Sequence, residues 1–269
     1  MQFAWGAAIV IVVGVVGLVV YALTRPTVTA QTVTTNLTSP GVVTSVTKVP
    51  PKVFDAVGVS SPTATVEPPT IVANQPPLTS SNKPEVLFVG AEFCPFCGSE
   101  RWPLIVALSR FGHFEDLANM QSSPNSVFPG LQTFTFYGTT YVSRYVAFDG
   151  IELYSDTPDA HGVYTRIARL SPDEASLVAR YGGGRADPFV DIDNQTVAST
   201  SGFSPAVLVG QSQGQIAGEL SQPATPTGQA VVASANYLTA GICKATHQLP
   251  TSVCASKGVR AATIALGLA

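Results

Sequence analysis

The sequence predicts an α/β domain, with a central mixed sheet flanked by helices, preceded by one transmembrane helix and a flexible stalk. Three observations predict this arrangement. The chain starts with a long apolar run at 3–23, and a segment rich in Thr, Ser and Pro follows it. Farther along, a short apolar run at 85–90 precedes two cysteines and a segment at 98–110 whose apolar residues have helical spacing. We therefore expect an anchor at 1–25, a stalk at 26–83 and a folded domain at 84–269.

The composition excludes several functional classes. Charged residues make up 12% of the chain, which is about half of the share in ordinary globular proteins. No run is rich in Lys and Arg, and the net charge is -3, so nucleic acid is not an expected partner, because phosphate binding needs clustered cations. The histidines His113, His161 and His247 lack the spacing of metal ligands. We expect neither a metal site nor a cofactor.

The apolar run at 3–23 has no ionisable side chain and, as a helix, is long enough to cross the apolar core of a bilayer, about 30 Å thick. Trp5 and Tyr21 stand near its ends, where such rings favour the membrane interface, and Arg25 closes it. The alternative is a signal peptide cleaved near Ala30, although the run is long for a signal core. We expect an uncleaved, single-pass anchor.

The segment at 26–83 has few aromatic residues and no helical period, so it is not expected to bury enough surface to fold. As a flexible tether it would have an end-to-end distance of about 40 Å. The alternative for the apolar patch at 53–57 is that it docks on the domain. Stalks of this composition are commoner on exported proteins, so the domain is expected outside the cytoplasm. Arg25, Lys48 and Lys52 argue for the opposite orientation.

The chemistry is expected at Cys94 and Cys97, which follow the apolar strand and stand at the start of a helix. The free backbone N–H groups and the positive end of a helix dipole stabilise a thiolate at the first cysteine of such a motif. Two intervening residues place the second thiol within reach, so that it can resolve a mixed disulfide.

The segment at 91–97, Ala-Glu-Phe-Cys-Pro-Phe-Cys, resembles the active-site segment of thioredoxin-like proteins, in which a strand leads to Cys-x-x-Cys and then to a helix with a proline, here Pro103. The resemblance implies a thioredoxin-like fold with insertions. It also implies that Cys94 is the attacking thiolate and Cys97 the resolving thiol.

One departure from thioredoxins concerns proton transfer. Phe88 occupies the strand position at which thioredoxins carry a buried acid. Proton transfer at Cys97 would then need another group, and Glu92 and Glu100 are the candidates.

Thioredoxin-like proteins also carry a cis-proline opposite the cysteines, which holds the substrate chain. The extended segment at 187–192, which begins Asp187-Pro188, fits this element, and a turn followed by an alternating strand at 195–200 would complete a hairpin. Pro188, with Asp187 beside it, is therefore the expected substrate-binding position. Pro205 is the alternative.

Between these parts the chain is longer than a minimal thioredoxin. The segments at 132–137 and 140–148 are rich in aromatic and β-branched residues and are predicted strands. A helix is predicted at 171–181, with a serine cap and proline at its first position. Three residues of the second strand segment either line a substrate groove or belong to the core: Tyr141, Arg144 and Tyr145.

The second cysteine pair, Cys243 and Cys254, follows a predicted helix at 229–241. A structural disulfide between them would stabilise the fold by about 2–3 kcal/mol, because it constrains the unfolded chain. The alternative is a second redox couple that exchanges with Cys94 and Cys97. A metal site with His247 is disfavoured, since the spacing is not that of a zinc finger.

The chain combines an N-terminal apolar segment, the Phe-Cys-Pro-Phe-Cys site at 93–97, a Pro-Phe-Val-Asp-Ile strand at 188–192, and late Ile-Cys and Val-Cys pairs. This combination resembles DUF929, a domain-of-unknown-function family of membrane-anchored archaeal and actinobacterial proteins. The resemblance covers about 84–258. It implies the fold but supplies no substrate.

These observations predict a membrane-tethered thiol–disulfide oxidoreductase that acts on protein cysteines through Cys94 and Cys97. Its partners would be protein thiols or disulfides, together with a membrane redox partner. Two alternatives stay open: a non-catalytic thioredoxin-like interaction module with structural disulfides, and a peroxidase. The motif does not fix the direction of electron transfer, because oxidases, reductases and isomerases of one fold differ in reduction potential.

Overall fold

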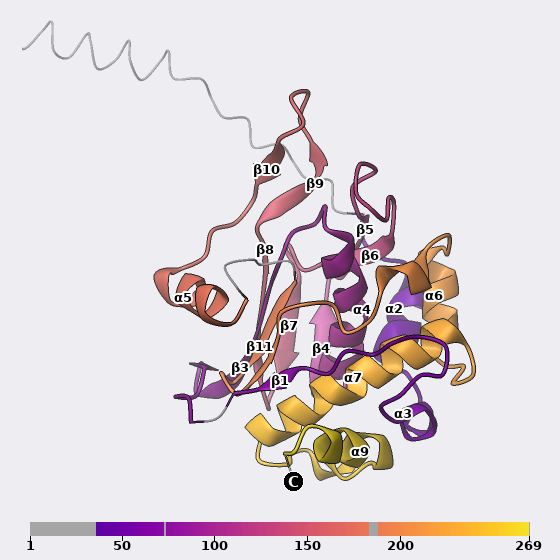
Figure 1. Cartoon of the computed structure of the whole chain (residues 1–269), viewed down its shortest axis with the longest axis vertical. Coiled ribbons are helices and arrows are strands. Elements are labelled where there is room, and N and C mark those ends of the chain that lie inside the picture. Colours follow the sequence, from indigo (N-terminus) through magenta and orange to yellow (C-terminus); the bar gives the residue numbers. More distant parts are fainter. Residues whose placement is uncertain (1–35, 73, 183–187, 269) are drawn as a thin grey trace, which may run out of the picture. The chain divides into compact units, whose positions relative to one another are not determined.

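A mixed β-sheet with helices on both faces forms the centre of the structure (Figure 1). The structure is a computed structural model, and it describes residues 36–72, 74–182 and 188–268. The anchor expected at 1–25 lies outside these residues. Each helix within the described ranges is too short or too polar to cross a bilayer.

The described residues form eight α-helices, one 3₁₀-helix and twelve strands. The helices are α2 (Pro40–Thr47), α3 (Pro51–Val57), α4 (Pro95–Leu108), α5 (Pro172–Tyr181), η1 (Pro205–Leu208), α6 (Gln213–Glu219), α7 (Pro226–Ala245), α8 (Thr251–Cys254) and α9 (Lys257–Ala265). The strands are β1 (Thr70–Ile71), β2 (Thr79–Ser80), β3 (Lys83–Gly90), β4 (Gly112–Glu115), β5 (Ala118–Gln121), β6 (Gln132–Thr135), β7 (Thr140–Ser143), β8 (Ala147–Glu152), β9 (Tyr154–Pro158), β10 (Tyr164–Arg166), β11 (Phe189–Ile192) and β12 (Thr196–Ala198).

The long strand β3 is the centre of the sheet. β8 lies parallel to it, and β11 lies antiparallel to it, with Val190 opposite Phe88. β12 pairs with β11 and β1 with β12, both antiparallel, so the order across the sheet is β8-β3-β11-β12-β1. β2 pairs with the first residues of β3.

Both faces of β3 are buried. Because successive side chains of a strand point to opposite faces, Val86 and Phe88 join the large core that also contains α4 and α7. Leu87 and Val89 join a smaller core beneath α5. Figure 1 shows α5 on one side of the sheet, with α4 and α7 on the other. This double burial explains why the strand has an almost continuous apolar sequence.

The residues at 36–72 are folded, which corrects the flexible stalk expected at 26–83. α2 packs against α4 and α6, and α3 packs against α7 and α9. Val53 and Phe54 of α3 are 1% and 2% exposed. The docking alternative for the patch at 53–57 is therefore confirmed.

Polar contacts also hold α3 in place. Asn236 of α7 donates hydrogen bonds to the carbonyl oxygens of Phe54 and Gly58, at 3.0 and 2.7 Å. The carboxylate of Asp55 accepts one from the backbone N–H of Gly258 in α9, at 2.9 Å. The sequence at 36–72 shows no helical period of its own. Its apolar side chains are buried by helices far along the chain, such as α7 and α9.

The predicted strand at 140–148 is in fact two strands, β7 and β8, separated by a bend. Its Tyr141 belongs to the core, since its hydroxyl donates to the carbonyl of Leu108 at 2.8 Å and its ring packs on Phe114 and Phe148. The helix predicted at 171–181 is α5, and Ser171 and Glu174 form its capping box.

Candidate functional site

Cys94 and Cys97 lie in the first turn of α4, just after β3 ends. Cys94 is the N-cap residue, and its sulfur accepts a hydrogen bond from the backbone N–H of Cys97 at an N–S distance of 3.3 Å. Pro95 takes the first helical position, where no N–H is needed. Both cysteines carry buried thiol groups, 5% and 0% exposed. The helix therefore directs its N-terminus at the sulfur of Cys94.

Cys97 packs against the end of β3 at Gly90. A Cβ atom at Gly90 would lie 2.7 Å from the ring of Phe88 and 3.1 Å from the sulfur of Cys97, so no larger residue fits without displacement. Burial raises the pKa of Cys97, and its neighbour Cys94 raises it further, whereas the guanidinium of Arg101 lowers it. The first thiolate of the pair is therefore expected at Cys94.

A fully buried ion pair lies behind the cysteines. Arg101 of α4 donates from Nε and Nη2 to the two carboxylate oxygens of Glu152 in β8, at 2.8 and 2.6 Å, and both side chains are 0% exposed. The guanidinium also lies 5.5 Å from the ring centre of Phe88. The strand position at which thioredoxins carry a buried acid therefore holds the ring of Phe88, and the guanidinium of Arg101 lies over this ring. No sequence pattern links Arg101 to Glu152, because the two residues are 51 positions apart along the chain.

The two candidate proton-transfer groups are both buried acids. Burial raises the pKa of Glu92 to about 7, against a hydrogen bond at 2.5 Å from the hydroxyl of Thr135, which lowers it. Burial raises the pKa of Glu100 to about 8, against a hydrogen bond at 2.7 Å from the backbone N–H of Gly202. Glu92 is thereby connected to β6, and Glu100 to the loop before η1.

Pro188 is buried and comes directly before β11. Since Phe189 pairs with Val89, Pro188 lies level with Gly90, at the end of the sheet where the cysteines begin. Asp187 and the peptide bond that joins it to Pro188 fall outside the described residues. Pro205, the alternative, starts the 3₁₀-helix η1. The structure therefore brings Pro188 to the cysteine end of the sheet.

Aromatic residues from two inserted hairpins surround the cysteine turn. Phe93 stacks on Tyr164 of β10, with ring centres 4.2 Å apart, and Phe96 meets the edge of Phe128 at 5.9 Å. Phe96 is 37% exposed and Val127 is 75% exposed. The sequence signal for this surface was the excess of aromatic residues between the two halves of the domain, but only the fold shows which of them reach the site.

A family model described as "Domain of unknown function (DUF929)" matches residues 69–244. The chain belongs to this family. No curated protein and no solved structure matches the chain. The DUF929 match contains Cys94, Cys97, Pro188 and Cys243, and it ends before Cys254.

In this DUF929 protein the second cysteine pair, Cys243 and Cys254, forms a disulfide that joins α7 to α8. Arg110, just past the end of α4, contacts Thr239 at 3.4 Å and Ser256 at 3.2 Å, so the disulfide lies near that end of α4. Cys97 lies near the other end, about 20 Å away along the helix axis. The arrangement favours a structural disulfide over direct exchange between the two pairs of one chain.

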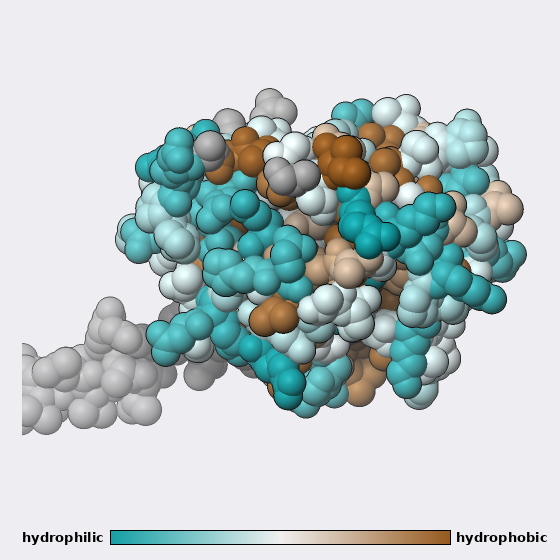
Figure 2. Space-filling model, turned by 90° about the horizontal axis from the view of Figure 1, so that it is seen from below, coloured by the Kyte–Doolittle hydropathy of each residue, from teal (hydrophilic) through white to brown (hydrophobic). Residues whose placement is uncertain are grey.

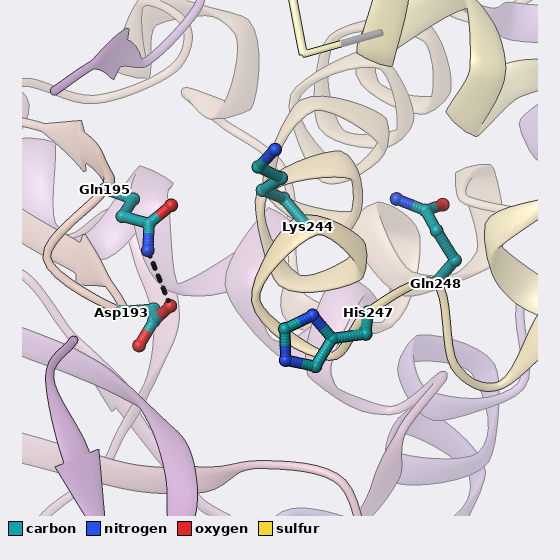
Figure 3. A pocket seen from close by; sticks show the side chains of 5 residues that line it. All are labelled: Asp193, Gln195, Lys244, His247 and Gln248. Carbon is teal, nitrogen blue, oxygen red and sulfur yellow. Dashed lines mark hydrogen bonds between the residues drawn. The ribbon is translucent and has the colours of Figure 1, made fainter. Parts of the chain in front are cut away.

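The end of the domain near the disulfide also carries a hollow of about 410 Å³. Figure 3 shows Asp193 and Gln195 on one side of it and Lys244, His247 and Gln248 on the other. Viewed from below, hydrophilic residues cover most of this end, and hydrophobic residues form small separate groups (Figure 2). No group of three or more His, Cys, Asp or Glu residues in the described ranges could hold a metal ion.

Proposed function

We propose that this DUF929 protein is a thioredoxin-like thiol–disulfide oxidoreductase that acts on cysteines of other proteins. The observation that carries the proposal is the place of the thiols of Cys94 and Cys97 at the N-terminus of α4, directly after the central strand β3. Pro188, on the neighbouring strand β11, lies at the same end of the sheet. A nucleophile, a resolving thiol and a proline suited to hold an extended chain are thereby gathered at one edge.

The sheet order supports the thioredoxin-like assignment. A parallel pair, β3 and β8, is followed across the sheet by two antiparallel strands, β11 and β12, and helices cover both faces. This is the mixed sheet flanked by helices that the resemblance implies, with β4–β7, β5–β6 and β9–β10 as additions.

The proposed exchange balances as follows in the reducing direction. The thiolate of Cys94 attacks one sulfur of a substrate disulfide, so that a Cys94–substrate bond forms and the other substrate sulfur leaves as a thiolate. Cys97 then attacks the sulfur of Cys94, the Cys94–Cys97 bond forms, and the second substrate sulfur leaves. The proton of the Cys97 thiol goes to a released thiolate, and two electrons pass to the substrate. The oxidising direction is the reverse.

The surroundings of the pair favour a polypeptide substrate. Exposed apolar side chains are found near the pair: Phe96, between the two cysteines, is 37% exposed and meets Phe128, whose neighbour Val127 is 75% exposed. Such a surface suits an extended chain with apolar residues next to its cysteine, as a partly unfolded protein presents. A small charged thiol would gain little from it.

The proposed location is at a membrane, by means of the apolar segment at 3–23, with the domain outside the cytoplasm. The disulfide Cys243–Cys254 supports an oxidising compartment, since such bonds are rare in the cytosol.

Replacing Cys97 with Ser tests the proposal. Cys97→Ser in the full chain removes the resolving thiol, so mixed disulfides with substrate proteins should accumulate on Cys94 and disappear on reduction. The matched control is Cys94→Ser, which keeps Cys97 and should trap nothing, because Cys97 is 0% exposed. Absence of trapped species in Cys97→Ser, with Cys94 alkylating no faster than a free cysteine, would refute the oxidoreductase.

A non-catalytic interaction module is the second candidate, and the burial of Cys94, 5% exposed, favours it. In that case Cys94 and Cys97 would form a bond with no role in exchange. Alkylation of the reduced full chain across a pH series separates the two. An exchange enzyme gives rapid labelling of Cys94 at neutral pH, whereas a passive module gives slow labelling that rises only in alkaline solution.

A further inference from the structure

Arg101 takes no part in the exchange steps above, yet it is buried beside the resolving cysteine. It lies four residues after Cys97 on α4, and residues four apart in a helix are neighbours on one face. Its Nη2 donates to the carbonyl oxygen of Ala91 at 3.0 Å, and the backbone of Ala91 also hydrogen-bonds Cys97. The Ala91 backbone therefore contacts both side chains.

Glu152 fixes the guanidinium in this place. The bidentate contact leaves the planar group little freedom, because two of its hydrogen bonds run to one carboxylate. The third nitrogen, Nη1, is buried and has no hydrogen-bond partner among the described residues. A buried donor without a partner costs free energy, and a negative charge formed within its reach would reduce that cost.

We propose that Arg101, held by Glu152, is a positioning residue that stabilises the thiolate of Cys97 in the resolving step. The proposal rests on the proposed function. A buried thiol ionises with difficulty unless a cation is near. Here the cation lowers the free energy of the thiolate and takes up no proton, and the proton goes to the substrate thiolate released earlier. The Cys94–Cys97 bond forms as the Cys94–substrate bond breaks.

A two-phase reaction of the reduced full chain tests the role of Arg101. An aromatic disulfide reagent releases one coloured thiolate when Cys94 attacks and a second when Cys97 resolves. The rate of the second phase does not depend on reagent concentration, so its pH profile reports the ionisation of Cys97. Arg101→Gln should raise the midpoint of this profile by about one pH unit, which slows resolution about tenfold below the midpoint.

Glu152→Gln separates a charge role from a structural one. It leaves the guanidinium without its counter-charge, so the midpoint should fall, opposite to the shift in Arg101→Gln. If the ion pair had only a structural role, the midpoints of both variants would shift in the same direction, or neither midpoint would shift. Arg101→Lys keeps the positive charge and should restore most of the wild-type midpoint even where thermal stability drops.

Arg110→Gln is the matched control. Arg110 is another largely buried arginine, and its hydrogen bonds go to Asn236, Thr239 and Ser256. Its substitution should leave the second-phase profile unchanged while the melting temperature falls.

The outcomes separate this inference from the proposed function. If the wild type shows no rapid first phase, the proposed function fails. If both phases occur but Arg101→Gln and Glu152→Gln leave the midpoint unmoved, or shift it in the same direction, the inference about Arg101 is overturned and the function stands. If Arg101→Gln does not fold, the direction of the shift in Glu152→Gln decides alone.

Discussion

The two cysteine pairs of the domain stand in opposite surroundings. Cys94 and Cys97 are thiols at the beginning of a helix, and the buried guanidinium of Arg101 acts on Cys97. Cys243 and Cys254 are joined by a disulfide and lie where α7 ends and α8 follows, although all four cysteines belong to one hydrophobic core. We expect the backbone and the charges around each pair to decide its reactivity. The predictions below test this contrast, from the largest expected effect to the smallest.

The largest contrast is in exchange activity. Cys94→Ser should reduce thiol–disulfide exchange on a reduced or oxidised protein substrate to the uncatalysed background, because the attacking sulfur is gone. The double variant Cys243→Ala/Cys254→Ala should keep the rate within about twofold of wild type, since the two pairs are about 20 Å apart along α4. A large loss of rate in the folded double variant would break the contrast and revive the relay.

The second prediction concerns pH and Glu100. Burial raises the pKa of Glu100 from an ordinary 4.5 to about 8, so the folded state binds a proton that the unfolded state has released. This contribution to stability is complete below about pH 4.5 and is lost as pH rises from there through about 8, on the order of 5 kcal/mol in total. Glu100→Gln keeps an acceptor for Gly202 and should remove this decline, as denaturant unfolding at several pH values would show. Parallel pH profiles for the two proteins would contradict it.

Stability, and not activity, should depend on the second pair. Cys243→Ala/Cys254→Ala should lower the free energy of unfolding by about 3 kcal/mol, because the unfolded chain loses the constraint of a short loop. Denaturant unfolding under non-reducing conditions measures this. The single variant Cys94→Ser is the control and should change stability by less than about 1 kcal/mol.

The smallest effect is expected at Thr135. Thr135→Val keeps the shape of the side chain but removes the hydroxyl that hydrogen-bonds Glu92. The pKa of Glu92 should rise further, since this hydrogen bond lowers it, and the free energy of unfolding should fall by about 1–2 kcal/mol. Carboxyl titration by NMR and denaturant unfolding check the two effects. A lowered pKa of Glu92 would show that the hydrogen bond does not favour the charged form.

Local patterns predicted the centre of the site. β3 could be predicted because a strand buried on both faces has a nearly continuous apolar sequence, and α5 because its capping residues are four neighbours in the chain. The first turn of α4 could also be predicted from residues that are neighbours in the chain. The two cysteines and their place at a helix start were therefore visible without a structure.

What the sequence could not predict depends on pairing between distant segments. Arg101 meets Glu152 only because β8 lies beside β3 with Gly90 opposite Glu152. The residues at 36–72 lacked a period and were expected to be unfolded, yet their partners, α7 and α9, lie near the other end of the chain. Membrane attachment stays a prediction, since the segment that carries it lies outside the described residues.

The contact between α3 and α9 has a consequence for synthesis of the chain. Asp55 and Gly258 are 203 residues apart, and Asn236 bonds Phe54 from 182 residues away. A ribosome releases the chain from its N-terminus, so α3 emerges long before the helices that bury Phe54 exist. Phe54 therefore stays exposed to solvent until the chain has been synthesised past Gly258. Premature termination before Asn236 would therefore leave α3 exposed, and a quality-control protease could recognise it.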